Sequence, residues 1–129
     1  MKRIILGIIT ILTLSANCSC WGSPARKMEI YYFYSNICEQ CDEKGKFFTM
    51  FNDKTGDLQG TYPYSLMLYS YFQPGAEAKL EALEMKYQVK TEVLFPILFI
   101  NDKVLQGENE IQDNLRDVFI QEGELEIQK

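Results

Sequence analysis

Two cysteines three positions apart, Cys38 and Cys41, are the residues of this 129-residue chain whose type and spacing most directly allow chemistry. Such a pair can cycle between dithiol and disulfide, because a cysteine thiolate attacks disulfides. The same spacing also occurs in static disulfides and in zinc sites, and two cysteines can simply be small core residues. Four interpretations are therefore open, and the surrounding residues have to separate them.

A zinc site is disfavoured by the shortage of further ligands. Structural zinc takes four ligands, usually from two ligand pairs, but the chain has no histidine and no second Cys-x-x-Cys after Cys41. A purely structural disulfide is also disfavoured, because closing so small a ring constrains the unfolded chain little and so adds little stability. We therefore favour a redox-active pair and expect no metal and no bound cofactor.

The first twenty residues have the pattern of an export signal. Lys2 and Arg3 precede a short apolar run at residues 4–14, and small and polar residues follow the run. This order is typical of a secretory signal, and the run is too short to span a bilayer comfortably. The alternative is a buried N-terminal helix or strand. Export predicts an extracytoplasmic location, in the periplasm or at the cell surface, where disulfides persist.

Two kinds of processing fit the export segment at residues 1–20. One is cleavage near Ala16, and the other is lipoprotein processing with Cys18 as the acylated first residue, because residues 14–18 resemble a bacterial lipobox. Lipidation of Cys18 would attach the protein to a membrane through a lipid anchor, with residues 21–27 as a short tether.

The Cys-x-x-Cys pair falls where the hydrophobic period changes. Residues 28–35 are rich in β-branched and aromatic side chains and predict a buried strand, whereas after Cys41 Phe47 and Phe51 recur at helical spacing. At such a strand-to-helix junction, the free N–H groups and the dipole of the first helical turn would stabilise a thiolate on Cys38. Cys41, one turn further on, would be shielded and positioned to resolve a mixed disulfide.

The remaining pattern predicts one α/β domain over residues 28–122, followed by a frayed tail at residues 123–129. Residues 52–60 predict a turn-rich connection. The predicted order is β-α-β-α-β-β-α, with strands at residues 28–35, 61–72, 91–100 and 103–106, and with helices after Cys41, at residues 76–89 and after Gly107. The first βαβ unit must be parallel and right-handed, and the terminal hairpin is antiparallel. Helices should therefore cover both faces of a mixed four-stranded sheet.

Pro96 lies in the middle of an apolar strand pattern, where proline is normally excluded. One way to accommodate this residue is a cis bond between Phe95 and Pro96 at the start of the third strand. The alternative is a trans proline on an edge strand or at a bulge.

The composition predicts a globular domain with an acidic surface. Hydrophobic residues make up 47% of the chain, charged residues 24%, and the net charge is −5. This is enough apolar material for one core. Binding to nucleic acid needs clustered Lys and Arg, and the sequence has no basic stripe. We therefore expect no nucleic-acid partner.

Taken in order, these motifs resemble the thioredoxin/glutaredoxin superfamily. The matching stretches are YYFYSNICEQC, which contains the cysteine pair, and VLFPILFINDKVLQGENEI, which contains Pro96. The resemblance implies a thioredoxin-like fold over residues 28–122. It also implies that Cys38 is the attacking thiol and Cys41 the resolving thiol. The residues that would line the substrate groove are Ile37, Glu39, Gln40, Phe95 and Pro96, and the backbone of Phe95 would pair with a bound peptide.

The sequence departs from the superfamily at several of these positions. Ile37 stands where thioredoxins usually have Trp, Glu39 and Gln40 replace Gly-Pro, and Tyr32 replaces a buried Asp. Phe95 and the stretch QGENE do not match the glutathione-binding residues of glutaredoxins, so we infer no glutathione binding. The charge of Glu39 should raise the pKa of the Cys38 thiol, which favours a reducing or isomerising enzyme over a strong oxidant.

The sequence therefore predicts an extracytoplasmic thiol-disulfide oxidoreductase. Its substrates would be protein or peptide disulfides and dithiols, and its electrons would pass to or from another protein that serves as redox partner. The alternative is a thioredoxin-fold binding or adaptor module, or a lipoprotein, in which the Cys38–Cys41 pair does not turn over.

Overall fold

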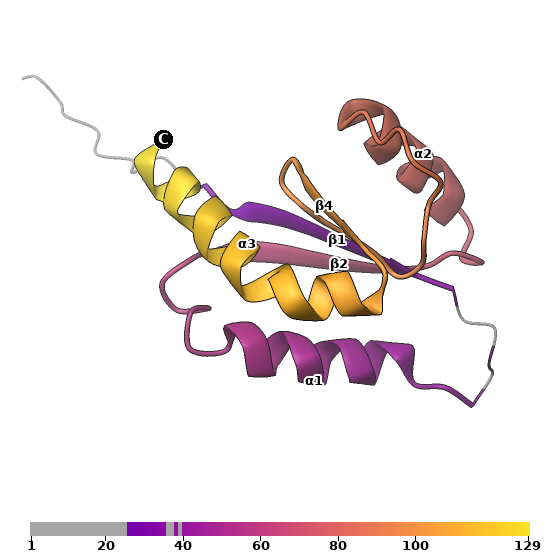
Figure 1. The fold of residues 1–129 in the computed structure, drawn as a ribbon, viewed down its shortest axis with the longest axis horizontal. Helices are drawn as coiled ribbons and strands as arrows, with labels where there is room; N and C mark the ends of the chain where they lie inside the picture. Colours follow the sequence, from indigo (N-terminus) through magenta and orange to yellow (C-terminus); the bar gives the residue numbers. More distant parts are fainter. Residues whose placement is uncertain (1–25, 36–37, 39) are drawn as a thin grey trace, which may run out of the picture.

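The computed structural model describes residues 26–35, 38 and 40–129 (Figure 1). The predicted export segment, including Cys18, lies outside the described residues, as do Ile37 and Glu39 of the predicted groove. Helices and strands follow in the predicted order: β1 (Met28–Tyr34), α1 (Glu43–Thr55), β2 (Tyr64–Ser70), α2 (Ala76–Lys86), β3 (Ile97–Ile100), β4 (Lys103–Gln106) and α3 (Glu108–Gln128).

The four strands form one mixed sheet in the order β2-β1-β3-β4. β1 and β2 are parallel, as the first βαβ unit requires, and β3 is antiparallel to both β1 and β4. The predicted hairpin is present, and its turn contains Asn101 with a positive φ of 51°. The prediction of an α/β fold with a mixed four-stranded sheet is confirmed.

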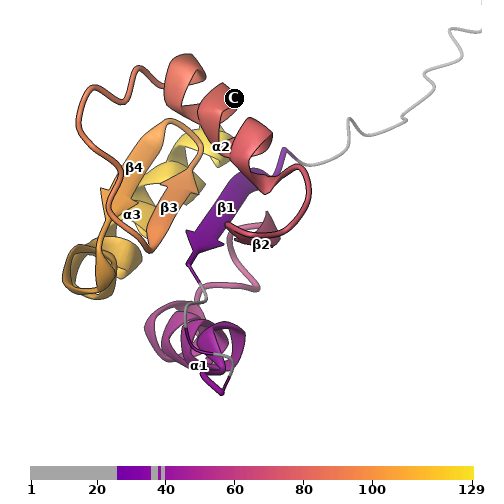
Figure 2. The ribbon, with the colours of Figure 1, turned by 90° about the vertical axis from the view of Figure 1, so that its right-hand side faces the viewer.

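Helices cover both faces of this sheet, with α1 and α3 on one face and α2 on the other (Figures 1 and 2). Side chains of β1 alternate between the two faces: Tyr32 packs with α1 and α3, whereas Phe33 packs with α2. In β3, Leu98 and Phe99 divide between the two cores in the same way. A strand covered on both sides needs apolar residues at every position, and all four residues of β3 are buried.

The third strand begins later than the sequence predicts, because residues 91–96 are not part of the sheet. Pro96 has no N–H to donate to a neighbouring strand, so β3 starts directly after it. The Phe95–Pro96 peptide bond is cis, the first of the two arrangements considered. The segment before Pro96 is held by the side chain of Gln106 and not by strand pairing. Gln106 Oε1 accepts from the Leu94 N–H at 2.9 Å, and Nε2 donates to Thr91 Oγ1 at 3.1 Å.

Three predicted ends of helices are wrong, and the second strand is shorter than predicted. α2 ends at Lys86 rather than at residue 89, and β2 covers Tyr64–Ser70 rather than residues 61–72. Residues 52–55, expected in a connection, form the last turn of α1. Residues 123–128, expected to be a frayed tail, continue α3 as far as Gln128. The tail is helical because this part of α3 is packed: Glu122 and Gly123 are buried, and the hydroxyl of Tyr62 donates a hydrogen bond to Glu124.

Candidate functional site

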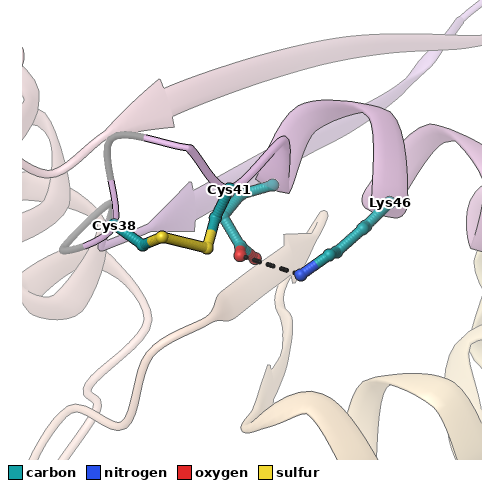
Figure 3. The surroundings of a disulfide bond; sticks show 4 residues. Cys38, Cys41 and Lys46 are labelled. Atoms are coloured by element: carbon teal, nitrogen blue, oxygen red, sulfur yellow. Dashed lines mark hydrogen bonds and ion pairs between the residues drawn. A yellow bond between two sulfur atoms is a disulfide. The ribbon is translucent and has the colours of Figure 1, made fainter.

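Cys38 and Cys41 form a disulfide in the loop between β1 and α1 (Figure 3), with their Cα atoms 5.2 Å apart. The backbone N–H of Cys41 donates to the carbonyl of Cys38 at 3.1 Å, so a tight turn holds the pair. Cys38 is exposed and Cys41 is half-buried. Neither is buried, so the interpretation of the pair as two small core residues is wrong. Cys38 is therefore the member of the pair that is more accessible to another molecule.

The cysteines precede α1: Cys38, expected at or just before the first helical turn, lies five residues before Glu43, the first residue of the helix. The helix begins at Glu43 with Asp42 as its N-cap, because the Asp42 carboxylate accepts a hydrogen bond from the Gly45 N–H at 2.9 Å. One of the free N–H groups of the helix is therefore occupied by a carboxylate. Asp42 also places a negative charge directly after Cys41, and a nearby negative charge disfavours a thiolate.

Pro96 lies at the end of the sheet from which the chain leaves β1 for the cysteines. Because β3 is antiparallel to β1, Ile97 pairs with Phe33, and Pro96 stands level with the last residues of β1. The Gly107 N–H donates to the carbonyl of Pro96 at 2.8 Å, which brings the start of α3 to the same place. Three chain segments far apart in sequence thus meet at the end of the sheet where β1 finishes.

A cavity of about 220 Å³ lies between these segments. It is lined by Tyr32, Glu43, Lys46, Phe47, Met50, Pro96, Glu108 and Gln112. Pro96 and the first turn of α1 therefore face the same cavity. This turn begins at Glu43, two residues after Cys41. Pro96 lines this cavity, whereas Cys38, Gln40 and Cys41 do not.

The cavity is charged, although Tyr32 forms part of its wall. Lys46 Nζ lies 3.4 Å from Glu43 Oε1 (Figure 3), and Glu108 is the other carboxylate of the lining. Burial raises the pKa of Tyr32, and the charges of Glu43 and Glu108 raise it further. The phenol is therefore protonated throughout the physiological pH range. It can donate a hydrogen bond into the cavity, but it cannot supply a charge there.

Sequence reasoning missed Glu43, Lys46 and Glu108 as residues of this region. Glu43 and Lys46 had a detectable signal, because an i, i+3 pair in the first turn after Cys41 must project on one side of the helix. Glu108 had none. Its place beside Pro96 depends on the hydrogen bond from Gly107 and on the pairing of β1 with β3, which joins residues 64 to 70 positions apart.

Phe95 does not share the cavity with Pro96. Its ring lies on the α2 side of the sheet, 5.1 Å from the ring of Tyr71, and it is half-buried there. Gln40 is exposed on the cysteine loop. Phe95 and Pro96, which were predicted to flank one groove, therefore line two different hollows on opposite sides of the sheet.

The described residues contain no group of three or more His, Cys, Asp or Glu side chains placed to hold a metal ion. Of the helices in the described ranges, none is both long and apolar enough to cross a membrane.

Comparisons of this chain with protein-family models, with curated proteins and with solved structures found no match.

Proposed function

We propose that this protein is an extracytoplasmic thiol-disulfide oxidoreductase with a thioredoxin-like fold, and that Cys38 and Cys41 reduce or isomerise protein disulfides. The observation that carries the proposal is the exposed Cys38–Cys41 disulfide on a loop at the same end of the sheet as Pro96. A static disulfide within four residues would stabilise the fold little, so reactivity is the better reason for its position on the surface.

The reduced protein would act in two exchange steps. The Cys38 thiolate attacks one sulfur of a substrate disulfide, the substrate S–S bond breaks, and the leaving thiolate takes up a proton. The Cys41 thiolate then attacks Cys38 Sγ, which breaks the mixed disulfide and releases the second substrate thiol after protonation. The substrate gains two electrons and the protein is left with the Cys38–Cys41 disulfide. A dithiol protein partner returns it to the reduced state.

The charges around the loop favour the reducing direction. Asp42 and Glu43 follow Cys41 directly, and the Asp42 carboxylate occupies a helix N–H that could otherwise stabilise a thiolate. Strong oxidants owe their high potential to a stabilised thiolate in the reduced state. Carboxylates near the pair have the opposite effect, so the disulfide form is comparatively stable.

An extracytoplasmic location is supported by the export pattern of residues 1–20. Mass determination of the N-terminus in the native host distinguishes cleavage near Ala16 from lipidation of Cys18. An unprocessed Met1 would contradict export.

Insulin reduction in the presence of dithiothreitol tests the activity. The expected result is a rate well above the uncatalysed reaction, lost in Cys38→Ala protein that still shows the unfolding transition of the wild type. A wild-type rate equal to the uncatalysed reaction would sink the proposal and favour a binding module with a locked disulfide.

A further inference from the structure

A second hollow, of about 160 Å³, lies on the α2 side of the sheet and is bordered by Phe95. Its apolar part consists of Tyr71, Leu80, Val93 and Phe95, and its acidic part consists of Glu77, Glu81 and Glu84. We call it the α2 groove. Within the described residues, the side chains that line it include three carboxylates and no Lys or Arg.

The three carboxylates form one stripe along α2. At 3.6 residues per turn, positions 77, 81 and 84 fall within about 60° of one another around the helix axis. The lysines of α2 lie on the other side: Lys79 Nζ is 4.5 Å above the ring of Tyr31, and Lys86 Nζ is 5.1 Å from the ring of Tyr87. The helix thus presents only negative charge to the groove.

This negative charge reaches the floor of the groove. The Tyr71 hydroxyl donates to Glu77 Oε1 at 3.3 Å. The charge of Glu77 raises the pKa of Tyr71, with smaller contributions from burial, from that hydrogen bond and from Glu81 and Glu84. A cationic group placed on Tyr71 would therefore lie in an attractive field, next to an aromatic face that also attracts cations.

A large apolar side chain is exposed next to the aromatic floor of the groove. Phe72 is 66% exposed, and its ring lies 5.6 Å from the ring of Tyr71. Exposed apolar side chains that border a hollow are typical of surfaces that bind another molecule.

The α2 groove opens at the same end of the sheet as the cysteine loop. Tyr71 directly follows β2, and its N–H donates to the carbonyl of Tyr34 at 2.8 Å. Tyr34 is the last residue of β1, four positions before Cys38. A polypeptide with its own cysteine at Cys38 would therefore have the groove within a few residues' reach.

We propose that the α2 groove binds a Lys- or Arg-containing segment of the disulfide substrate, next to the substrate cysteine. The cation lies among Glu77, Glu81 and Glu84, and an apolar neighbour packs on Val93 and Phe95. The proposal rests on the proposed oxidoreductase function, since it names the class of substrate that the cysteines act on. Acidic segments are excluded by repulsion, and charge complementarity of this kind sets partner choice and association rate.

The test uses three peptide disulfides that differ only in two residues beside the cysteine, which are Lys, Gln or Glu. With reduced wild-type protein at low salt, the expected rate constants fall in the order Lys, Gln, Glu, with about tenfold between the extremes, because several exposed carboxylates act together. Glu77→Gln/Glu81→Gln/Glu84→Gln protein should reduce all three peptides at similar rates. In wild-type protein the differences should shrink at about 0.5 M salt.

A matched control separates the groove from overall charge. Asp102→Asn/Asp113→Asn/Asp117→Asn makes the same change in net charge at exposed positions in the β3–β4 turn and on α3. This variant should keep the wild-type preference for Lys. Loss of the preference in the control, or its survival in the Glu77/Glu81/Glu84 variant, would overturn the inference.

Binding without chemistry distinguishes failure of the inference from failure of the proposed function. Fluorescently labelled peptides with Ser in place of Cys are titrated with the oxidised protein and followed by anisotropy. Tighter binding of the Lys peptide, lost in the Glu77/Glu81/Glu84 variant, supports the groove even where no peptide is reduced. Equal affinities together with Cys38-dependent reduction leave the proposed function intact and contradict the groove.

Discussion

The Asp42 carboxylate accepts a hydrogen bond from the Gly45 N–H at 2.9 Å, so the residue directly after Cys41 is the N-cap of α1. A cap stabilises the helix by satisfying an N–H group that has no partner within it. At this position the cap also occupies the end of the helix dipole nearest the cysteines. Stability of α1 and redox properties of the pair are therefore linked through one side chain.

Replacing Asp42 should separate these two effects. Asp42→Ala is expected to lower the free energy of unfolding by about 1 kcal/mol, because the cap is lost. Asp42→Ser keeps a capping oxygen without the charge, so it should leave stability nearly unchanged. Both variants should raise the reduction potential of the pair by about 10–20 mV, as expected for the loss of one nearby, partly screened charge. Urea unfolding and redox equilibration with glutathione measure the two quantities. An unchanged potential in Asp42→Ser would show that this charge does not affect the pair.

The two cysteines should differ in what their loss produces. Cys38→Ala is expected to abolish exchange, because the exposed thiol starts the reaction. Cys41→Ala should retain the attack and accumulate mixed disulfides with substrates, since the resolving thiol is absent. Non-reducing electrophoresis and mass spectrometry of material from the native host detect these adducts. Adducts that form through Cys41 in the Cys38→Ala protein, and not through Cys38, would reverse the assignment.

Tyr32 should make stability sensitive to alkaline pH. Burial, Glu43 and Glu108 raise the pKa of Tyr32 above its ordinary value of 10.0. The folded state therefore holds the phenol proton more tightly than the unfolded state does. That contribution is complete below pH 10 and declines as the pH rises above it, by up to about 1.4 kcal/mol per pH unit for a single group.

Comparison with Tyr32→Phe isolates that contribution. The substitution keeps the ring that stacks on Phe47 at a centroid distance of 3.8 Å. The variant should lose less stability than the wild type between pH 9 and 11, measured by urea unfolding. Parallel losses in the two proteins would mean that Tyr32 ionises no later in the folded chain than in the unfolded chain.

Arg116 ties α3 to the far end of α1. Its guanidinium donates to both carboxylate oxygens of Asp57, at 2.8 and 2.9 Å, and to the carbonyl of Lys54 at 2.8 Å. Arg116→Ala should lower the melting temperature modestly at neutral pH, because both groups of the ion pair are largely exposed. Arg116→Lys keeps the charge but cannot donate to both carboxylate oxygens in the same geometry. Its melting temperature should lie between those of Arg116→Ala and the wild type.

Acid should erase the difference between Arg116→Ala and the wild type. The hydrogen bond and charge of Arg116 lower the pKa of Asp57 below its ordinary value of 3.8. The stabilisation is therefore present above about pH 4 and is lost as the pH falls through the lowered pKa. Melting temperatures measured from pH 7 down to pH 2 follow this convergence. A constant difference across that range would show that Asp57 is not the partner that matters.

Much of the fold was predictable because its signals are local. The run of aromatic and β-branched residues in β1 and the four residues of β4 were recognisable from side-chain type alone. The start of α1 was misplaced because the cysteine spacing suggested a helical turn. Asp is a favoured N-cap residue, and the cap formed by Asp42 places the start of the helix at Glu43. The local signals conflicted there, and the cap decided the outcome.

The end of α3 was not predictable because it depends on a contact between residues far apart in the sequence. Gly123 looked like the start of a tail, since glycine is a weak helix former. In the folded chain a Cβ at Gly123 would lie 2.9 Å from the Cβ of Tyr62, so the absence of a side chain is what allows the helix to pack there. This contact joins residues 61 positions apart and leaves no pattern in the sequence. The charged cavity beside Pro96 depends on similarly distant contacts.

Phe95 and Pro96 are neighbours in the chain, yet one borders the acidic α2 groove and the other borders the cavity beside α1. A single step of the backbone therefore separates two hollows that lie on opposite sides of the sheet. Under the proposed function, substitutions along the outer side of α2 would change the choice of substrate and leave the sequence of the disulfide loop untouched. We would then expect related proteins to differ along this one helix while they keep the same cysteine loop.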